Sequence, residues 1–483
     1  MSATPPADLT GSTSSTEAGA PRPARSQRAS RQKGSRGRLL RRILLGLLVL
    51  ILVALAGGYL YAKPLLLTAT GYAAHNACAV PGVAGRTDDP AGDLPPNPLV
   101  PYLKSNPSSD RSSVSSSIFG FLAGQTAYYN DKAGCTLGAP LTAYGPLTPV
   151  TSAKNPVATA PAPTPKPAVA AALATAFGDD LDAAKKKALG TRGIVVLKDG
   201  ALVGERYGDG FTASTPQLGW SMAKSVTNLL VGRLVQQGKI SVSDAKLRPE
   251  WTDDRAGITI DQLMRMTSGL AWDETYDLGT PITAMLYLEP DMGGYVAKQP
   301  LAHPVGTYQQ YSSGSTNVLC SVLRAKTGVG PDLPRKELLA PLGLSSAVWE
   351  TDTTGLPVCS SYLWATPRDW AAIGQFALQD GQWGGEQLLP SGWMASSTVA
   401  QAVAKTEDPG YAAGWWANRL PDGSLVEPSL PADAYWASGH DGQRIYVVPS
   451  EKLVVVRLGF TPTLKGKDVR TVDLVRDLIT ATR

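Results

Sequence analysis

The chain has 483 residues, of which 43% are hydrophobic and 18% charged, a composition typical of a protein that folds around a sizeable core. Its net charge of +5 is concentrated at the front: residues 1–42 carry nine Arg or Lys against Asp8 and Glu17, a balance of +7, so the remainder carries −2. The folded part is therefore not basic, and nucleic-acid binding is not expected.

An apolar run, residues 43–62 (ILLGLLVLILVALAGGYLYA), has twenty residues without a charge and directly follows Arg41 and Arg42. About 20 apolar residues in a helix span the ~30 Å hydrocarbon core of a bilayer, and Arg-rich flanks stay on the cytoplasmic side. The sequence predicts a disordered basic cytoplasmic arm over 1–42 and one transmembrane helix over 43–62. The helix would cross the cytoplasmic (inner) membrane once, with the N-terminus on the cytoplasmic side and the rest of the chain on the extracytoplasmic side. A cleaved signal peptide is the alternative, but its basic leader would be short and its apolar stretch roughly 7–15 residues.

The four cysteines all lie beyond this run, in a compartment where disulfides persist: Cys78, Cys135, Cys320 and Cys359. Of the three possible pairings we favour Cys78 with Cys135 and Cys320 with Cys359, because each pair then stays within one region of the chain. Buried free thiols are the alternative. No metal site is expected, since the chain has three histidines and neither a CxxC nor an HxxxH pattern.

Composition divides the part that follows the apolar run into three segments. Residues 63–138 contain two cysteines and an aromatic patch, and are expected to form a small juxtamembrane cap. Residues 139–167 are too rich in Pro for a helix or an inner strand, which predicts an extended connector. Residues 168–483 are expected to form the main folded domain.

Within that domain, residues 193–207 contain two apolar stretches around an Asp-Gly turn, which predicts a β-hairpin. Residues 221–238 have apolar side chains at helical spacing and end at a glycine, which predicts a buried helix. Helical patterns and loops dominate 242–435, two more strands are expected in 444–459, and a last helix in 467–482. Strands near both ends around a mostly helical middle indicate an α+β fold, with an antiparallel sheet flanked by helices.

Ser221 and Lys224 form an S-x-x-K motif at the start of the predicted helix. Residues three apart share one helical face, so the lysine can reach the serine hydroxyl and, if burial keeps it neutral, remove its proton. The motif alone is weak, because Ser30 and Lys33 in the basic arm match it too. Ser221 is the stronger candidate because it follows a predicted hairpin and begins an apolar helix.

Two further elements lie downstream. Tyr311 begins a Tyr-Ser-Ser triplet, and a phenol beside a lysine cation is expected to ionise more easily and to relay protons. Gly439 to Gln443 (GHDGQ) opens a late strand, and a glycine-flanked strand edge can offer a backbone N–H to an oxyanion. The alternative for the Tyr-Ser-Ser triplet is an ordinary loop sequence, and the alternative for residues 439–443 is an ordinary Asp-Gly turn. Asp273 and Glu274 are interpreted as a solvated helix start.

The order S-x-x-K, Y-x-S and a Gly-flanked triplet resembles the serine β-lactamase and penicillin-binding-protein superfamily, closest to the branch with class C β-lactamases, esterases and 6-aminohexanoate-dimer hydrolase. Blocks such as GWSMAKSVTNLLVG and SGHDGQRIYVVPSEKLVVVRLG extend the resemblance over most of 190–460. It implies the β-lactamase/transpeptidase-like form of the α+β fold.

The resemblance also implies roles. Ser221 would be the acylated nucleophile, Lys224 its base and Tyr311 the proton relay, with the backbone amides of Ser221 and Gln443 as the oxyanion hole and no cofactor. The substrate would be bound by Trp220, Ser313, His440, Asp441 and Gly442. His440 stands where penicillin-recognising enzymes carry the lysine of a Lys-Thr-Gly triplet, and Ser313 stands where many carry asparagine.

Without that lysine the grip on a substrate carboxylate is weakened, so a small neutral amide or ester is the expected substrate. A D-Ala-D-Ala carboxypeptidase or β-lactamase is the first alternative, and a non-catalytic cell-wall-binding protein of the same fold is the second. An α/β-hydrolase is a third, because residues 219–223 nearly match G-x-S-x-G and His440 could be its histidine. It is disfavoured because no strand is expected directly before Ser221. The sequence gives no oligomeric state.

Overall fold

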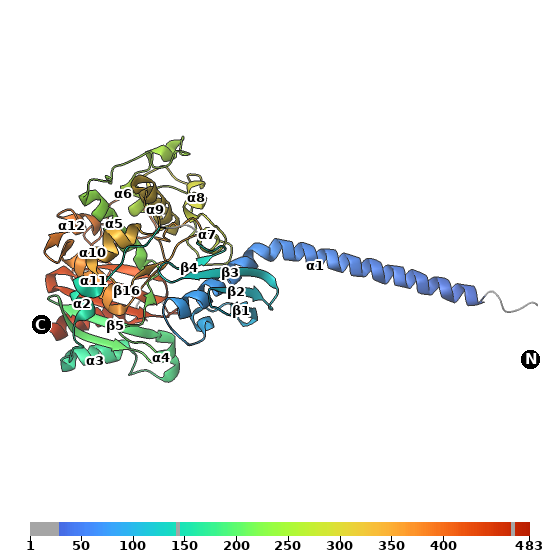
Figure 1. Cartoon of the computed structure of the whole chain (residues 1–483), viewed down its shortest axis with the longest axis horizontal. Helices are drawn as coiled ribbons and strands as arrows, with labels where there is room; N and C mark the ends of the chain where they lie inside the picture. The colour runs from blue at the N-terminus through green and yellow to red at the C-terminus, as the bar shows by residue number, and fades with distance from the viewer. Residues whose placement is uncertain (1–28, 142–144, 465–468) are drawn as a thin grey trace, which may run out of the picture. The chain divides into compact units, whose positions relative to one another are not determined.

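The computed structural model describes residues 29–141, 145–464 and 469–483, and Figure 1 shows the arrangement of the elements. The chain divides into two units, residues 1–62 and residues 63–483, and each is described by itself. The helices are α1 (Ala29–Gly82), α2 (Pro156–Thr159), α3 (Pro167–Ala176), α4 (Ala183–Leu189), α5 (Met222–Gln236), α6 (Ile260–Met264), α7 (Pro281–Tyr287), α8 (Met292–Ala297), α9 (Ser313–Thr327), α10 (Ala340–Leu342), α11 (Pro367–Leu378), α12 (Trp393–Ser397) and α13 (Thr471–Thr482).

The strands fall into one large sheet and several small ones. They are β1 (Leu103–Pro107), β2 (Ser113–Ile118), β3 (Leu122–Asn130), β4 (Gly134–Leu137), β5 (Thr191–Lys198), β6 (Ala201–Tyr207), β7 (Gln217–Leu218), β8 (Tyr308–Gln309), β9 (Val348–Trp349), β10 (Leu363–Ala365), β11 (Gln382–Trp383), β12 (Glu386–Gln387), β13 (Lys405–Thr406), β14 (Trp416–Ala417), β15 (Tyr435–Gly439), β16 (Gln443–Val448) and β17 (Leu453–Gly459).

Helix α1 is longer than the sequence predicted. Its segment Gly37–Gly82 is long and apolar enough to cross a membrane, in agreement with the expected span over 43–62. The helix begins at Ala29, so the disorder expected for residues 1–42 does not hold over 29–42, while 1–28 lie outside the described residues. It also continues past 62, because the Leu- and Ala-rich residues that follow favour helix and are buried in the second unit.

The segment expected to be a cap, 63–138, consists of the end of α1 and the antiparallel sheet β1-β2-β3-β4. Apolar side chains of the two pack together in a small core that includes Ala74, Ala79, Val114 and Ala127. The Cys78–Cys135 disulfide crosses this core and joins α1 to β4, as the favoured pairing predicted. The segment belongs to the same unit as the rest of 63–483.

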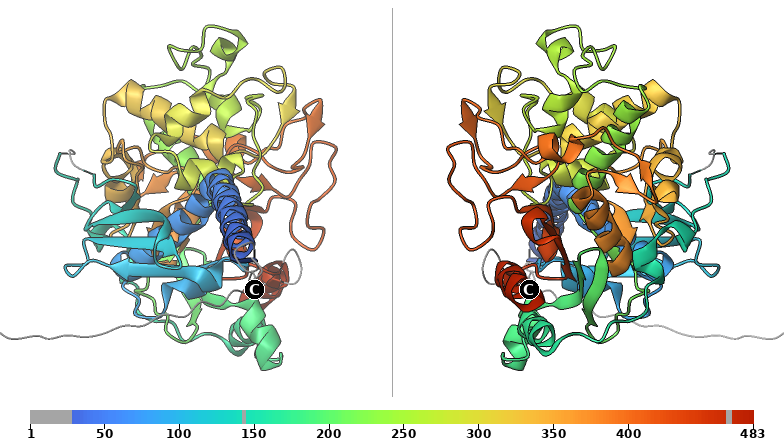
Figure 2. Two further views of the ribbon diagram at one scale, coloured as in Figure 1. Left: turned by 90° about the vertical axis from the view of Figure 1, so that its right-hand side faces the viewer. Right: turned by 90° about the vertical axis from the view of Figure 1, so that its left-hand side faces the viewer.

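The large sheet has the order β14-β15-β16-β17-β5-β6, and all neighbours in it are antiparallel. The predicted hairpin is β5 and β6, and the predicted late strands are β16 and β17, which pair with β5. Helices α5 and α11 pack on one face of the sheet, and α3 and α13 on the other, as the side views show (Figure 2). The expected α+β fold, with strands from both ends of the domain joined in one sheet, is therefore confirmed.

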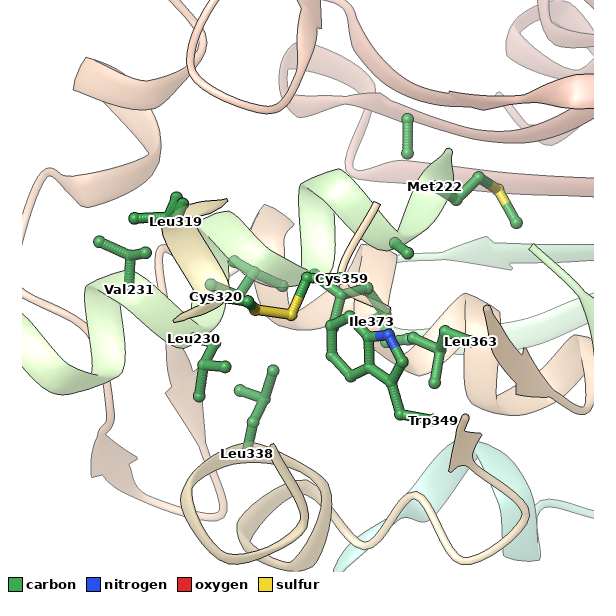
Figure 3. Close-up of a cluster of buried hydrophobic side chains, with 14 of the residues drawn as sticks. Met222, Leu230, Val231, Leu319, Cys320, Leu338, Trp349, Cys359, Leu363 and Ile373 are labelled. Carbon is green, nitrogen blue, oxygen red and sulfur yellow. A yellow bond between two sulfur atoms is a disulfide. The ribbon is translucent and has the colours of Figure 1, made fainter. Parts of the chain in front are cut away.

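Helix α5 runs through the main core, and the residues of its buried face pack against α9, α11 and the loop before β10 (Figure 3). The Cys320–Cys359 disulfide lies in this core and joins α9 to that loop, again as predicted. A helix buried along its length holds its first turn firmly, which fixes the position of Ser221.

The segment 139–167 is not the plain extended connector that the prolines suggested. It contains a 3₁₀ turn, Ser152–Lys154, and the short helix α2, whose first position is a proline. The buried Asn155 caps α2 and donates to Asp369 Oδ1 at 2.7 Å. Proline is tolerated in the first turn of a helix, where its missing N–H has no partner to lose.

A buried carboxylate connects the cap to the small sheet β7-β10-β9. Glu350 accepts from the Cys135 backbone N–H at 2.7 Å and from Trp364 Nε1 at 2.8 Å, and its Oε2 lies 2.8 Å from His75 Nε2 on α1. A Cβ added at Gly134 would lie 2.5 Å from the Glu350 side chain, so glycine is required at that position. One side chain thus satisfies donors from α1, β4 and β10.

We predict that Glu350→Gln destabilises the second unit by about 2–4 kcal/mol, because either amide orientation turns an N–H₂ towards a buried donor and removes a charge-assisted hydrogen bond. Guanidinium unfolding of the detergent-solubilised full chain measures this. The control is Glu386→Gln at an exposed position, which should leave the midpoint unchanged. Equal midpoints for both variants would contradict the role assigned to Glu350.

Candidate active site

A tight turn places Ser221 at the start of α5. The short strand β7, which the sequence did not indicate, pairs with β10, and the Gly219 N–H donates to the Leu363 carbonyl at 2.9 Å. Trp220 then has a φ of +48°, a conformation that costs energy for a bulky residue and is typical of sites that hold a side chain in a fixed direction. Ser221 follows as the residue before the first turn of α5.

Lys224 lies one turn further along α5, with its side chain buried under that turn. Its Nζ donates to Ser221 Oγ at 2.9 Å, to Ser313 Oγ at 2.9 Å and to the Ser360 carbonyl at 3.2 Å. Burial lowers the pKa of Lys224 to about 8, and the charge of Glu274 opposes this shift. A lysine with such a pKa is partly neutral near pH 8 and can accept the serine proton.

Glu274 is a member of the site that sequence reasoning missed. Its Oε1 accepts from Ser313 Oγ at 2.5 Å, and its Oε2 accepts from the Ser313 N–H at 2.8 Å and from Trp272 Nε1 at 2.6 Å. No helix begins at Asp273, which is exposed, so the interpretation as a solvated helix start is wrong. The spacing of two between Trp272, Glu274 and Tyr276 was the available signal, because alternate residues of an extended segment share a side.

Ser313 therefore connects the lysine to the carboxylate. It is fully buried as the first residue of α9, and Ser312 before it caps that helix by accepting from the Ser315 N–H at 3.0 Å. Its hydroxyl accepts from Lys224 and donates to Glu274, so both of its hydrogen-bonding roles are fixed.

Tyr311 lies across the same lysine. Lys224 Nζ is 4.7 Å from the centroid of the Tyr311 ring, and a side-chain hydrogen bond links Tyr311 to Ser221. The ring packs against Trp416, with centroids 5.9 Å apart, and the Tyr311 N–H donates to Asp408 Oδ2 at 3.2 Å. The loop around 405–416 thus sets the position of Tyr311.

The expected easy ionisation of Tyr311 is wrong. Burial, followed by the negative charge of Glu274, raises the pKa of Tyr311 well above its usual value, and the bond to Ser221 offsets only part of this. The lysine cation that would have lowered this pKa is itself discouraged by burial. Tyr311 remains a neutral phenol, which can pass a proton only by gaining one as it loses another.

The end of β15 packs directly on the turn before the serine. A Cβ on Gly439 would lie 2.1 Å from the Gly219 carbonyl, so only glycine allows this contact. His440, Asp441 and Gly442 then form a 3₁₀ turn with Asp441 at a φ of +57°. In this turn the Gln443 N–H donates to the His440 carbonyl, so the amide predicted for the oxyanion hole already has an acceptor.

His440 and Asp441 form a pair beside this turn. His440 Nδ1 lies 2.9 Å from Asp441 Oδ1, with the histidine side chain one-third exposed and the aspartate side chain buried. Within the described part of the chain, neither carboxylate oxygen of Asp441 accepts a hydrogen bond of good geometry. Gly442 lies against Arg457, whose Nη1 donates to the Gly442 carbonyl at 2.9 Å.

Trp220 is buried among aromatic rings rather than open to solvent. Its ring lies 5.7 Å from that of His440 and 6.3 Å from that of Tyr276, measured between centroids. On another side it meets Tyr72 of α1 at 6.0 Å, edge to face. The residue next to Ser221 therefore contacts the part of α1 that lies in the second unit.

The structure brings most of the predicted site residues together. Ser221, Lys224, Tyr311 and Ser313 are linked by the contacts above, and Trp220 touches His440. Gln443 is placed differently, with its N–H turned to His440 and its side chain bonded to both the N–H and the carbonyl of Gly459. Among the described residues, no group of three His, Cys, Asp or Glu lies where it could hold a metal ion.

Comparison with known proteins gives a consistent result. The family model described as Beta-lactamase matches residues 173–476. A 6-aminohexanoate-dimer hydrolase from Paenarthrobacter ureafaciens is 24% identical over 303 residues, covering 56% of this chain and 73% of that protein.

Solved structures share the fold. A candidate 6-aminohexanoate-dimer hydrolase from Bacillus anthracis has a TM-score of 0.52 at 24% identity, covering 61% of this chain and 80% of its own. A penicillin-binding protein homologue from Caulobacter crescentus has a TM-score of 0.51 at 16% identity, covering 66% of this chain and 98% of its own.

We predict that acylation of the chain by a fluorophosphonate speeds up with pH and levels off above a midpoint near pH 8. The prediction takes the neutral amine of Lys224, whose pKa burial lowers to about 8, as the base. The neutral fraction then falls about tenfold per pH unit well below that value. The measurement is the labelling rate by intact mass between pH 5.5 and pH 9.5. A flat profile would contradict Lys224 as the base.

We predict that Glu274→Gln moves this midpoint to lower pH. The carboxylate raises the pKa of Lys224, so its removal lets burial depress that pKa further. The matched control is Asp273→Asn, at the exposed neighbouring position, which should leave the midpoint in place. A wild-type midpoint in Glu274→Gln, at any absolute rate, would show that the carboxylate does not act on the lysine.

Proposed function

This chain belongs to the beta-lactamase family, and from that premise we propose that it is a membrane-anchored serine hydrolase that cleaves a small amide or ester through a Ser221 acyl-enzyme. The observation that carries the proposal is the 2.9 Å contact between Lys224 Nζ and Ser221 Oγ, made by a buried lysine whose pKa burial lowers to about 8. A buried, partly neutral amine on a serine hydroxyl has no stabilising role that a hydrophobic side chain would not fill better.

In the proposed reaction, neutral Lys224 takes the proton of Ser221 as Oγ attacks the carbonyl carbon. The negative charge on the carbonyl oxygen develops beside the start of α5, where the helix dipole favours an anion. The N–H groups of Met222, Ala223 and Lys224 already donate to backbone carbonyls, so they are not assigned to this oxygen. The Ser221 amide is one donor in this proposal. Gln443 is the other, provided that its N–H leaves the His440 carbonyl when substrate binds.

Collapse of this intermediate breaks the bond to the leaving group, which must receive a proton. We assign the transfer to Tyr311, which gives its hydroxyl proton to the leaving amine or alcohol and takes one from the Lys224 ammonium. Its raised pKa supports this concerted role and opposes a free phenolate. A water then attacks the acyl-enzyme, with the same two groups removing its proton, and Ser221 is restored.

Ser313 and Glu274 are proposed to position the lysine, since they fix one of its three acceptors. Trp220, His440, Asp441 and Gly442 are proposed to line the substrate site. A histidine in place of the lysine of a Lys-Thr-Gly triplet gives a weaker grip on carboxylates, which favours neutral substrates over β-lactams and D-Ala-D-Ala ends. The name of the Paenarthrobacter relative supports a linear amide as the substrate class.

For the cellular arrangement, we propose that α1 spans the cytoplasmic membrane once, with the N-terminus inside. Residues 63–138 would then form a cap and 168–483 the hydrolase on the outer side, with 139–167 between them. Two disulfides in the second unit support an oxidising compartment.

The test is detection of the acyl-enzyme by intact mass with a p-nitrophenyl ester, a linear amide oligomer, a D-Ala-D-Ala peptide and a cephalosporin. We expect an adduct with the ester or the linear amide, lost in Ser221→Ala. The matched control is Ser30→Ala, the serine of the second S-x-x-K motif, which should label like the wild type. An adduct that forms only with the cephalosporin or the D-Ala-D-Ala peptide would favour the penicillin-recognising alternative. No adduct at all would favour a non-catalytic wall-binding protein.

A further inference from the structure

The exposed aromatic side chains of the second unit gather at one place. Outside α1, the described residues expose four large hydrophobic side chains, of which Val399 stands apart. The other three are Tyr102, Phe119 and Phe121, with exposed fractions of 48%, 55% and 75%. The rings of Tyr102 and Phe119 are 5.1 Å apart, and the Phe119 N–H donates to the Tyr102 carbonyl at 2.9 Å. We call these three residues the aromatic turn.

The backbone of this turn is unfavourable for the residue that it carries. Phe119 and Gly120, between β2 and β3, have φ values of +53° and +88°. Tight hairpin turns with two positive φ values strongly favour Asn or Gly at the first position, and a bulky side chain there is strained. An exposed phenylalanine at such a position improves neither the turn nor the core, which indicates a role at the surface.

The direction of β3 shows where the aromatic turn points. At one end of the strand, Thr70 Oγ1 of α1 donates to the Ala123 carbonyl at 2.6 Å; at the other end, the Tyr129 ring lies against Gly82. Six strand residues and twelve helical residues cover about the same length, roughly 20 Å and 18 Å, so β3 runs beside α1 in the same direction. The aromatic turn, which precedes β3, therefore points back towards the start of the second unit.

The position of Phe121 along the axis of α1 follows from the same pairing of β3 with the helix. Phe121 precedes Ala123 by two residues, which is a distance of about 7 Å along a strand. The same distance along α1 corresponds to four to five helical residues, so Phe121 lies level with the residues four to five positions before Thr70. That level is close to Leu65, which is itself exposed, and to Lys63, the first charge after the apolar run. The apolar run ends at Ala62, three residues before Leu65, so the level of Phe121 on α1 lies within a few residues of the end of the proposed span. The interfacial layer that begins where the span ends is about 5–7 Å thick.

We propose that the aromatic turn inserts into the interfacial layer of the lipid bilayer and forms a second attachment of the catalytic unit beside α1. The inference rests on the proposed membrane anchoring by α1. Aromatic side chains at headgroup depth stabilise such contacts. A single helix allows the unit to swing and rotate, whereas two attachments fix which side of it faces the lipid.

The attachment is rigidly joined to the site. Gln125 on β3 donates to the Tyr287 carbonyl at 2.7 Å, and the Tyr287 ring stacks on Tyr72 with centroids 4.9 Å apart. Tyr72 in turn meets Trp220, the neighbour of Ser221. The second attachment thus fixes the orientation of the active site relative to the membrane surface.

The experiment uses the full chain in lipid nanodiscs, with single cysteines carrying an environment-sensitive fluorophore. The four native cysteines are paired, so each introduced thiol is labelled alone. We compare Phe121→Cys in the aromatic turn, Ser109→Cys at the polar turn at the other end of the same sheet, and Leu50→Cys in the apolar run. Fluorophosphonate labelling of Ser221 at the wild-type rate confirms that each variant is folded.

We expect lipids with a shallow doxyl group to quench the Phe121→Cys probe roughly two-fold or more, because the probe lies at headgroup depth. The Ser109→Cys probe should be unaffected, and deep doxyl groups should quench Leu50→Cys. Quenching at Leu50→Cys but not at Phe121→Cys overturns the inference, leaves the anchor in place and points to a protein partner or a second copy at the turn. No quenching at Leu50→Cys overturns the proposed anchor itself.

A second measurement avoids altering the turn. A probe at Gly124→Cys, an exposed and open position on β3, lies about 10 Å further along the strand than Phe121 and should be quenched more weakly than the Phe121→Cys probe in an otherwise native chain. The quenching should be lost when Phe119→Ser and Phe121→Ser are added. Retained quenching in that variant would overturn the role of the aromatic side chains.

Discussion

The site depends on keeping the Lys224 side chain out of water. An ammonium group buried without a directly bonded carboxylate is costly, and here the cost is lowered by three acceptors, two serine hydroxyls and the Ser360 carbonyl. The depressed pKa is the result of this burial. The buried face of α5, the disulfide beside it and the start of α9 hold those acceptors in place, so the environment of Lys224 depends on the whole core.

The elements that the sequence predicted well are those with a local signal. The hairpin of β5 and β6, the helix after Ser221 and the strands β16 and β17 each show their own periodicity or turn residues. Glu274 had only its alternate spacing with Trp272 and Tyr276 as a local signal. That spacing does not indicate its partners Ser313 and Lys224, which come from α9 and α5 and are brought to it by tertiary packing. The Gln443 amide donates to the His440 carbonyl because Asp441 and Gly442 both have positive φ, which is the geometry of the Asp-Gly turn named as the alternative for this triplet.

The extent of α1 shows a different limit. The apolar run identified the span, but the residues after it lack helical periodicity that distinguishes them from a linker. They are helical because they are buried, with His75 bonded to Glu350 and Tyr72 stacked on Tyr287. The last part of the helix is thus a component of the second unit, and it contacts Trp220, the residue beside Ser221. Tertiary contacts decided a boundary that composition could not.

The order of the central sheet has a consequence for biogenesis. Strand β5 pairs with β17, whose residues come more than 250 positions later in the chain, as in the pairing of Lys198 with Leu453. During synthesis β5 and β6 form an incomplete sheet until the C-terminal strands β16 and β17 have been made. Pairings of such separation form slowly. The edge of β5 that β17 covers stays unpaired during that interval, and the large sheet is complete only once the last strands are present.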